Sequence, residues 1–345
     1  MSESPLTAFA PWSSGATDRV VVVTGASSGV GRATARAFGA RGYSVGLLAR
    51  NLEALENAAR EVEEAGGRAL VLATDVADAD AVEAAAERAE AELGPIGVWV
   101  NVAMAAVLSP LSETSAHDIR RVTEVSYLGF VHGTMAALKP MRARDAGTVV
   151  QVGSALSYRS IPLQASYCGA KFAIRGFTDA VRTELMHDGS NVHITMVQLP
   201  ALNTPQFSRV KTTLPRHPQP VPPVFQPELA ADAIVWASEH RRREVWLGGS
   251  TYKTILGGFL APLAADRYLA RTSYRDQQTA LPVEPDRPDY LHDPVAGDPG
   301  AHGIFDADAK DRSLAWTISR HRRAVTLGVV TATALAGISA LRAAR

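Results

Sequence analysis

Several residue types are scarce in this chain of 345 residues, and their scarcity excludes some classes of protein. Cys168 is the single cysteine, so an intrachain disulfide is impossible, and the composition fits a reducing compartment such as the cytoplasm. We interpret Cys168 as a packed helix residue rather than a reactive thiol. Five lysines stand against thirty arginines, but the formal net charge is zero, so the whole chain carries no signal for nucleic-acid binding. The first eighteen residues lack a basic start followed by an apolar core, which argues against a secretory signal.

A glycine-rich turn follows the first apolar run of the chain. Residues 19–23, RVVVV, predict a buried parallel strand, and the turn TGASSGVG leads from it into a helix expected to end near Gly42. Such a strand, turn and helix start present backbone N–H groups to a pyrophosphate without a side chain in the way. The sequence therefore predicts a dinucleotide site at Gly25, Ser27, Ser28, Gly29, Val30 and Gly31.

The end of the second expected strand, YSVGLLA, bears on the choice of dinucleotide. At this place an acidic residue binds a ribose 2′-hydroxyl, whereas an arginine accommodates a 2′-phosphate. Arg50 stands nineteen residues after Gly31, so the sequence favours NADP(H) over NAD(H). The alternative is that Arg50 only opens the next helix, with its guanidinium in solvent.

Expected strands and helices alternate along the chain with few hairpin signals, and the helices include one over 115–140 and one over 251–271. This order predicts an α/β fold with a doubly wound parallel sheet, whose ligands bind beyond the carboxyl ends of the strands. Besides the glycine turn, the expected strand ends carry Arg50, Asp75, Asn101, Ser154 and Pro200.

Tyr167 and Lys171 lie four residues apart on an expected helix that runs to Gly189. Side chains with this spacing share one face, and a neighbouring ammonium lowers the pKa of a phenol from its usual value near ~10. The pair could therefore exchange a proton near neutral pH, with the Ser154 hydroxyl holding a substrate oxygen beside it. Alternatively, Tyr167 and Lys171 form an ordinary solvated pair.

These motifs together resemble those of the short-chain dehydrogenase/reductase family over about 19–250. TGASSGVG is similar to the family's cofactor loop, Asp75-Val76 to its adenine-contacting pair, and Ser154 with Tyr167 and Lys171 to its catalytic triad. The resemblance implies a Rossmann-type fold and hydride transfer between nicotinamide C4 and a carbonyl or alcohol carbon.

The resemblance also implies a role for each residue. Tyr167 would be the general acid or base, Ser154 would orient the carbonyl, and Lys171 would hold the nicotinamide ribose and lower the pKa of Tyr167. Thr204 resembles the threonine that contacts the carboxamide. The helix ending at Gly189 resembles the family's dimerisation element, so a homo-oligomer is expected.

Three positions depart from the family pattern. The segment Asn101-Val102-Ala103-Met104 keeps the asparagine and the alanine, both expected to bind cofactor, but has methionine for the final glycine. Ser126 stands where a catalytic asparagine is usual, and Pro200-Ala201 replaces Pro-Gly. These changes leave an alternative function open. The chain could be a catalytically impaired NADPH-binding protein with a regulatory role or with the role of a membrane-tethered scaffold.

Two irregular segments follow the expected catalytic core. Residues 205–227 are rich in proline, which indicates either a disordered connection or a lid over a lipophilic substrate. Residues 280–315 are rich in Pro, Asp and Gly, which predicts a linker or a strap lying on the fold. The spacing of His292 and His302 does not favour a metal site, and none is expected.

The last segment could contact a membrane. Residues 324–341 hold eighteen uncharged residues beside a basic cluster, long enough to just span a bilayer with the catalytic part on the cytoplasmic face. The alternative is a tail helix docked on the enzyme or on a second subunit. The expected division is then 1–18 flexible, 19–275 catalytic, 276–315 linker or strap, and 316–345 C-terminal helix.

Overall fold

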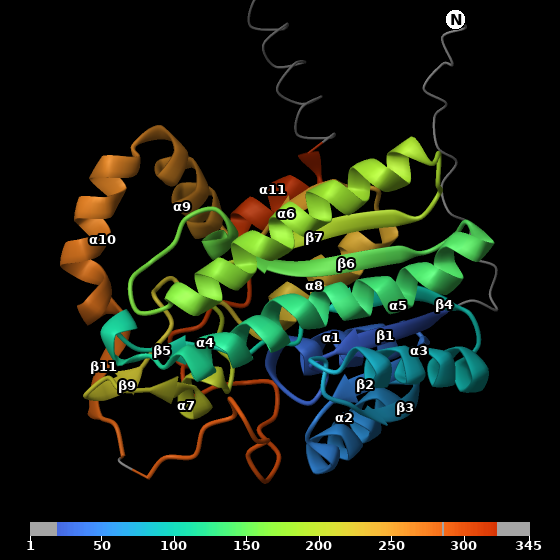
Figure 1. The fold of residues 1–345 in the computed structure, drawn as a ribbon, viewed down its shortest axis with the longest axis horizontal. Coiled ribbons are helices and arrows are strands. Elements are labelled where there is room, and N and C mark those ends of the chain that lie inside the picture. Colours follow the sequence, from blue (N-terminus) through green and yellow to red (C-terminus); the bar gives the residue numbers. More distant parts are fainter. Residues whose placement is uncertain (1–18, 285, 323–345) are drawn as a thin grey trace, which may run out of the picture.

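The fold is built on a seven-stranded sheet in which every neighbouring pair is parallel (Figure 1). A computed structural model describes residues 19–284 and 286–322. The strand order is β10-β7-β6-β4-β1-β2-β3. The strands are β1 (Val20–Thr24), β2 (Ser44–Ala49), β3 (Arg68–Ala73), β4 (Ile96–Asn101), β6 (Thr148–Ser154), β7 (His193–Leu199) and β10 (Glu244–Trp246).

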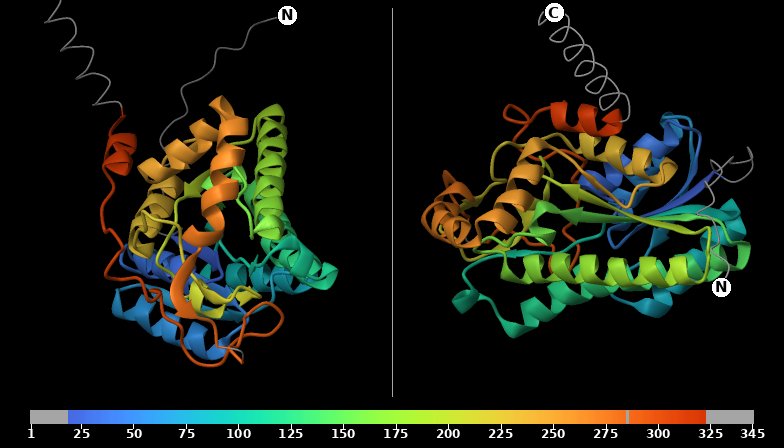
Figure 2. Two further views of the ribbon diagram at one scale, coloured as in Figure 1. Left: turned by 90° about the vertical axis from the view of Figure 1, so that its left-hand side faces the viewer. Right: turned by 90° about the horizontal axis from the view of Figure 1, so that it is seen from above.

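Helices cover both faces of this sheet (Figure 2). One face packs against α1 (Gly29–Gly39), α2 (Leu52–Glu64) and α8 (Pro227–Glu239). The other packs against α3 (Ala79–Leu93), α5 (Gly129–Arg144) and α6 (Ala165–His187). The predicted doubly wound α/β fold is thereby confirmed.

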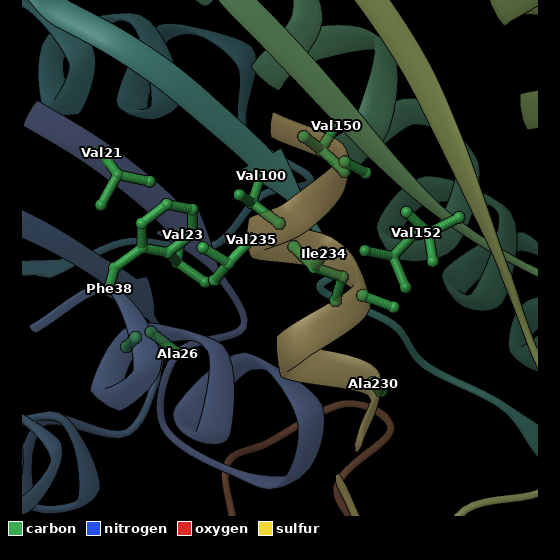
Figure 3. Packing of buried hydrophobic residues seen from close by; sticks show 14 of the residues in the cluster. Val21, Val23, Ala26, Phe38, Val100, Val150, Val152, Ala230, Ile234 and Val235 are labelled. Atoms are coloured by element: carbon green, nitrogen blue, oxygen red, sulfur yellow. The ribbon is translucent and has the colours of Figure 1, made fainter. Parts of the chain in front are cut away.

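The alternation of side chains along β1 explains why two cores form. Val21 and Val23 point into the core shared with α1 and α8, where Figure 3 shows them near Phe38 and Val235. Val20 and Val22 belong to the core on the opposite face. A strand buried on both faces must be apolar throughout, which is why RVVVV carries no polar alternation.

Two predicted helices are interrupted in the structure. The segment expected as one helix over 115–140 forms α4 (Ala116–Thr123), a π-helical turn η2 (Glu124–Leu128) and α5. The segment 251–271 forms two helices, α9 (Gly249–Leu260) and α10 (Pro262–Asp276). Pro262 explains the second break, because proline has no N–H to continue a helix and Ala261 before it adopts an extended φ of −142°.

The remaining elements are short and lie around the carboxyl edge of the sheet. The proline-rich stretch contains α7, β8 and β9, where no regular element was expected. Two further sheets have two strands each: β11 pairs with β9, and β5 pairs with β8. The bounds are β5 (Val107–Leu108), η1 (Leu111–Glu113), η3 (Ala155–Ser157), α7 (Gln206–Arg209), β8 (Lys211–Thr212), β9 (Arg216–Pro218), β11 (Gln278–Pro282) and α11 (Leu314–Arg320).

Residues 286–312, which we call the strap, return across the fold after β11. The strap bonds to α7 through the Tyr290 N–H and Arg209 O, and to the proline-rich stretch through the Lys310 N–H and Val224 O. Leu291 is fully buried within it. Within 19–284 and 286–322, no helix is long and apolar enough to cross a membrane. The predicted span 324–341 and the N-terminal residues 1–18 lie outside the described residues.

Candidate active site

A cavity of about 770 Å³ opens beyond the carboxyl ends of the strands. Its walls come from the glycine turn, the ends of β2, β4, β6 and β7, the helix α6, the hairpin α9–α10, the proline-rich stretch and the strap. Fifteen of the predicted site residues line it: Gly25, Ser27, Ser28, Gly29, Val30, Gly31, Arg50, Asp75, Val76, Ala103, Ser154, Tyr167, Lys171, Pro200 and Thr204.

The turn after β1 can be made only with glycines. Gly25 and Gly29 have φ values of +67° and +52°, in the left-handed region that disfavours other residues. A Cβ on Gly31 would lie 2.1 Å from the carbonyl oxygen of Gly25. The Ser28 side chain does not cap α1, so it leaves the first N–H groups of the helix for other acceptors. A helix start without a side-chain cap is the arrangement that binds a pyrophosphate.

The opposite end of the cavity holds Ser154, Tyr167 and Lys171. Ser154 is the last residue of β6, whereas Tyr167 and Lys171 lie one turn apart on α6. The Lys171 ammonium donates a hydrogen bond of 2.8 Å to the carbonyl of Val152 and lies 5.5 Å from the centre of the Tyr167 ring. An ammonium has three N–H donors, so two remain for other acceptors.

Burial governs the protonation of both groups on α6. Burial raises the pKa of the Tyr167 phenol, and interaction with the Ser154 hydroxyl opposes that rise without cancelling it. Burial also lowers the pKa of Lys171 to about 7. The prediction that Lys171 lowers the pKa of Tyr167 is therefore wrong for the protein as described. The reason is that the ammonium is itself desolvated and donates to Val152 rather than to the phenol.

Arg50 also lines the cavity, directly after the end of β2. Its guanidinium donates two hydrogen bonds of 2.5 Å, one to the carbonyl of Tyr290 and one to that of His292. Asp75, also at this end, accepts a bond of 2.5 Å from Arg121. Arg50 thus lies where the sequence places it, but it is held by the strap and does not extend into solvent.

The chain matches the model of the short chain dehydrogenase family over residues 19–214. The chain belongs to the short-chain dehydrogenase family. It is 31% identical to the uncharacterized oxidoreductase YxnA of Bacillus subtilis over 95% of this chain and 91% of that protein. The chain is therefore an oxidoreductase of this family, which acts on alcohol and carbonyl groups.

Other relatives and solved structures agree. The chain is 34% identical to the cis-4-hydroxycyclohexanecarboxylate dehydrogenase of Sinomonas cyclohexanicum, over 64% of this chain and 88% of that enzyme. A metagenomic short-chain oxidoreductase solved in complex with NADP superimposes with a TM-score of 0.57 and 26% identity, covering 66% of this chain and 96% of that one. Similarity to YxnA extends through the strap, well beyond the segment that the family model matches.

Asn101 and Ser126 are the two predicted site residues that the structure does not bring to the cavity. Asn101 is fully buried, accepts a bond of 2.8 Å from the Trp99 indole and donates one of 3.0 Å to Gln151. Ser126, in the π-helical turn, bonds both the N–H and the carbonyl of Ala105 at 2.8 and 2.7 Å. Both side chains therefore organise the polypeptide next to the cavity.

The sequence prediction missed two groups of lining residues. The α9–α10 hairpin contributes Gly257, Ala261, Ala264 and Leu269, and the strap contributes Tyr290, Pro294, Val295 and Pro299. For the hairpin, Pro262 signals the break that folds one helix back on the other. For the strap, the composition indicates an irregular segment but gives no local signal of where it lies.

Proposed function

We propose that this protein is an NADPH-dependent oxidoreductase that transfers a hydride between nicotinamide C4 and the carbon of a ketone, aldehyde or alcohol. The proposal rests chiefly on one observation: one cavity is lined by the start of α1, which has no side-chain cap, by Arg50 and by the group of Ser154, Tyr167 and Lys171. The residues fit the cofactor, because no side chain caps the helix start at the glycine turn and, among the described residues, Lys171 donates only to Val152, which leaves donors for ribose hydroxyls.

In this proposal each residue at the reaction end has one task. A bound nicotinamide cofactor supplies or accepts the hydride. The Tyr167 hydroxyl gives its proton to the substrate oxygen in reduction and takes it back in oxidation. The Ser154 hydroxyl holds that oxygen beside the phenol. The Lys171 ammonium, one turn from Tyr167 on α6, would hold the ribose hydroxyls of the nicotinamide half of the cofactor.

The preference for NADP(H) over NAD(H) rests on Arg50. Arg50 directly follows β2, and a guanidinium binds a 2′-phosphate through paired hydrogen bonds. The superimposed metagenomic oxidoreductase was solved with NADP bound, which supports the same assignment.

We also propose a lipophilic substrate. Beyond Tyr167 the cavity is walled by Met104, Leu108, Leu156 and Ile161, and by the small and apolar side chains of the α9–α10 hairpin. Each methylene buried there would raise kcat/KM by about fourfold at most. A homo-oligomer, a cytoplasmic location and membrane contact through 324–341 stay predictions from the sequence.

The test is NADPH oxidation with a series of ketones and aldehydes of increasing chain length. Tyr167→Phe should lower kcat by about 10²–10⁴-fold, because it removes the proton donor and little else. Tyr43→Phe is the matched control, since Tyr43 directly precedes β2 at the amino edge of the sheet and should leave the rate unchanged. Turnover that survives the change at Tyr167 would refute its role as the acid.

A further inference from the structure

The strap uses backbone donors that a dinucleotide would need. The N–H of Gly29, the first residue of α1, donates a hydrogen bond of 3.1 Å to the carbonyl of Gly300. Gly29 lies in the glycine turn, at the helix start that would bind a pyrophosphate. The strap carbonyl therefore lies at the same helix start where a phosphate oxygen would bind.

The strap also uses the guanidinium of Arg50. Both bonds that Arg50 donates go to strap carbonyls, those of Tyr290 and His292. Two carbonyl oxygens spaced in this way present the guanidinium with acceptors much as a phosphate group does, though without the negative charge. The two ends of the predicted nucleotide site, near the pyrophosphate and near the 2′-phosphate, thus have strap carbonyls as their partners.

Polar contacts hold most of the strap in this position. Asp298 pairs with the buried Arg32, which also pairs with Glu61 at 2.9 Å. The side-chain amide of Asn51 donates to the carbonyls of Val295 and Gly297 at 2.8 and 3.1 Å. Bonds of this kind exchange readily for bonds to water or to a ligand, and their net contribution to stability is small.

One polar group in the strap is poorly accommodated. The Tyr290 hydroxyl is buried beside Tyr167, and within the part of the chain that the structure describes it forms no hydrogen bond of normal geometry, the backbone of Ala106 being its polar neighbour. A buried hydroxyl without a partner costs free energy that is recovered when the group reaches water. The hydroxyl of Tyr290 therefore offsets part of the stabilisation that packing of its ring gives to the strap.

We propose that the strap and the dinucleotide compete for the Gly29 N–H and the Arg50 guanidinium, so that the strap leaves the crevice when NADP(H) binds. This inference rests on the proposed function. The charged 2′-phosphate is a stronger acceptor for Arg50 than two neutral carbonyls, whereas NAD(H) offers only hydroxyls there. Arg50 would then select NADP(H) partly because only that nucleotide can take it from the strap. Since only the open form binds, the fraction of closed strap weakens the apparent affinity.

Amide hydrogen exchange on the wild-type chain, with and without NADPH, tests the direction of the movement. We expect the amides of 290–303 to exchange faster once NADPH is bound, because the segment becomes exposed to water and the bonds from the Tyr290 N–H to Arg209 and from the Gly303 N–H to Asn203 are lost. Slower or unchanged exchange in saturated protein would mean that the strap stays in place over the nucleotide, which overturns the inference and leaves the proposed function standing. Failure to bind NADPH, measured by fluorescence titration, would overturn both.

A pair of strap variants tests the competition itself. Asp298→Asn removes the charge that holds the strap to Arg32, while Arg32 keeps its pair with Glu61. The dissociation constant for NADPH should fall by about three- to tenfold, because more of the protein is open. Asp308→Asn, at an exposed aspartate of the same strap, is the matched control and should leave it unchanged. Equal constants for Asp298→Asn and the wild type would refute competition.

Discussion

The sheet and the strap border the same cavity but are held by different forces. In β1, β4 and β6 every residue is buried, and the strands share apolar cores with helices on both faces. In the strap, Leu291 and Ala301 are buried and Tyr290 packs against the core, while its remaining contacts include hydrogen bonds and ion pairs with an exposed partner. One wall of the site is thus fixed by burial of apolar surface, and the facing wall by bonds that water can replace.

A binding site must keep its reacting groups in place and must also admit its ligand, and the two regions serve these two requirements separately. The groups that must keep their geometry, Ser154, Tyr167 and Lys171, stand on β6 and α6, where any displacement would open the core. The strap, which we propose moves to admit the nucleotide, has less apolar surface to expose than the sheet, chiefly that of Tyr290, Leu291 and Ala301. Substitutions in each region test that contrast.

The first prediction compares one apolar residue from each region. Phe38→Ala should lower the free energy of unfolding by about 3–5 kcal/mol, because Phe38 is fully buried between α1 and the sheet and its removal leaves a cavity. Ile304→Ala is the control from the strap, where the side chain is 62% exposed, and should change it by less than about 0.5 kcal/mol. Urea unfolding of both variants measures the two effects. Equal losses would show that the strap is as tightly packed as the sheet.

The second prediction concerns the free-energy cost of burying the Lys171 ammonium on α6. Burial lowers the pKa of Lys171 to about 7, well below its value in an unfolded chain. Between these values the unfolded chain binds a proton that the folded protein does not, so this group makes stability rise with pH. At pH 7.5 Lys171→Met should be the more stable protein, and its advantage should shrink by about 1.4 kcal/mol per pH unit up to pH 9.5.

The measurement for Lys171 is urea unfolding of both proteins across that pH range without nucleotide. Taking the difference between variant and wild type cancels the titration of all groups the two share. A difference that does not vary with pH would mean that Lys171 keeps its charge in the folded protein. Lys171 and Tyr167 would then form an ordinary solvated pair, which is the alternative interpretation of their spacing in the sequence.

The sequence is most informative about the sheet region, because its signals are local and periodic. RVVVV followed by TGASSGVG specifies a buried strand, a turn that requires glycine and a helix start within a dozen residues. Tyr167 and Lys171 share a face because of their spacing on one helix. The alternation of strands and helices brings their neighbours to the same edge of the sheet, and fifteen predicted residues do line one cavity.

The sequence prediction fails where the direction of a side chain, or contacts between distant parts of the chain, determine the position of a residue. Asn101 ends β4 as expected, but its side chain points to Trp99 and Gln151, and no local rule fixes that choice. Ser126 lies in a π-helical turn whose extra residue redirects the helix face, a feature that periodicity does not reveal. The strap has no apolar period, so its path across Gly29 and Arg50 depends on contacts between residues more than two hundred positions apart.

The smallest predicted effect concerns an ion pair at the far end of the strap. His302 bonds Asp306 at 2.7 Å and Glu228 of α8 at 3.0 Å. Burial alone would lower the pKa of His302, but the two carboxylates outweigh it and raise the pKa above its usual value. The protonated form is thus favoured in the folded protein. Its contribution to stability is fully present below the unfolded pKa of about 6.5 and is lost as the pH rises through the folded value.

Replacing this histidine should therefore matter at low pH only. His302→Gln should lower the free energy of unfolding by less than about 1 kcal/mol at pH 5.5, since the pair is partly exposed, and by nothing measurable at pH 8.5. His187→Gln, at an exposed histidine that forms no ion pair within the described residues, is the control and should show no such pH dependence. A loss at pH 5.5 as large as that of Phe38→Ala would mean that this charge network holds the strap as firmly as apolar burial holds the sheet. The strap could then not be displaced by the modest free energy that a nucleotide phosphate offers.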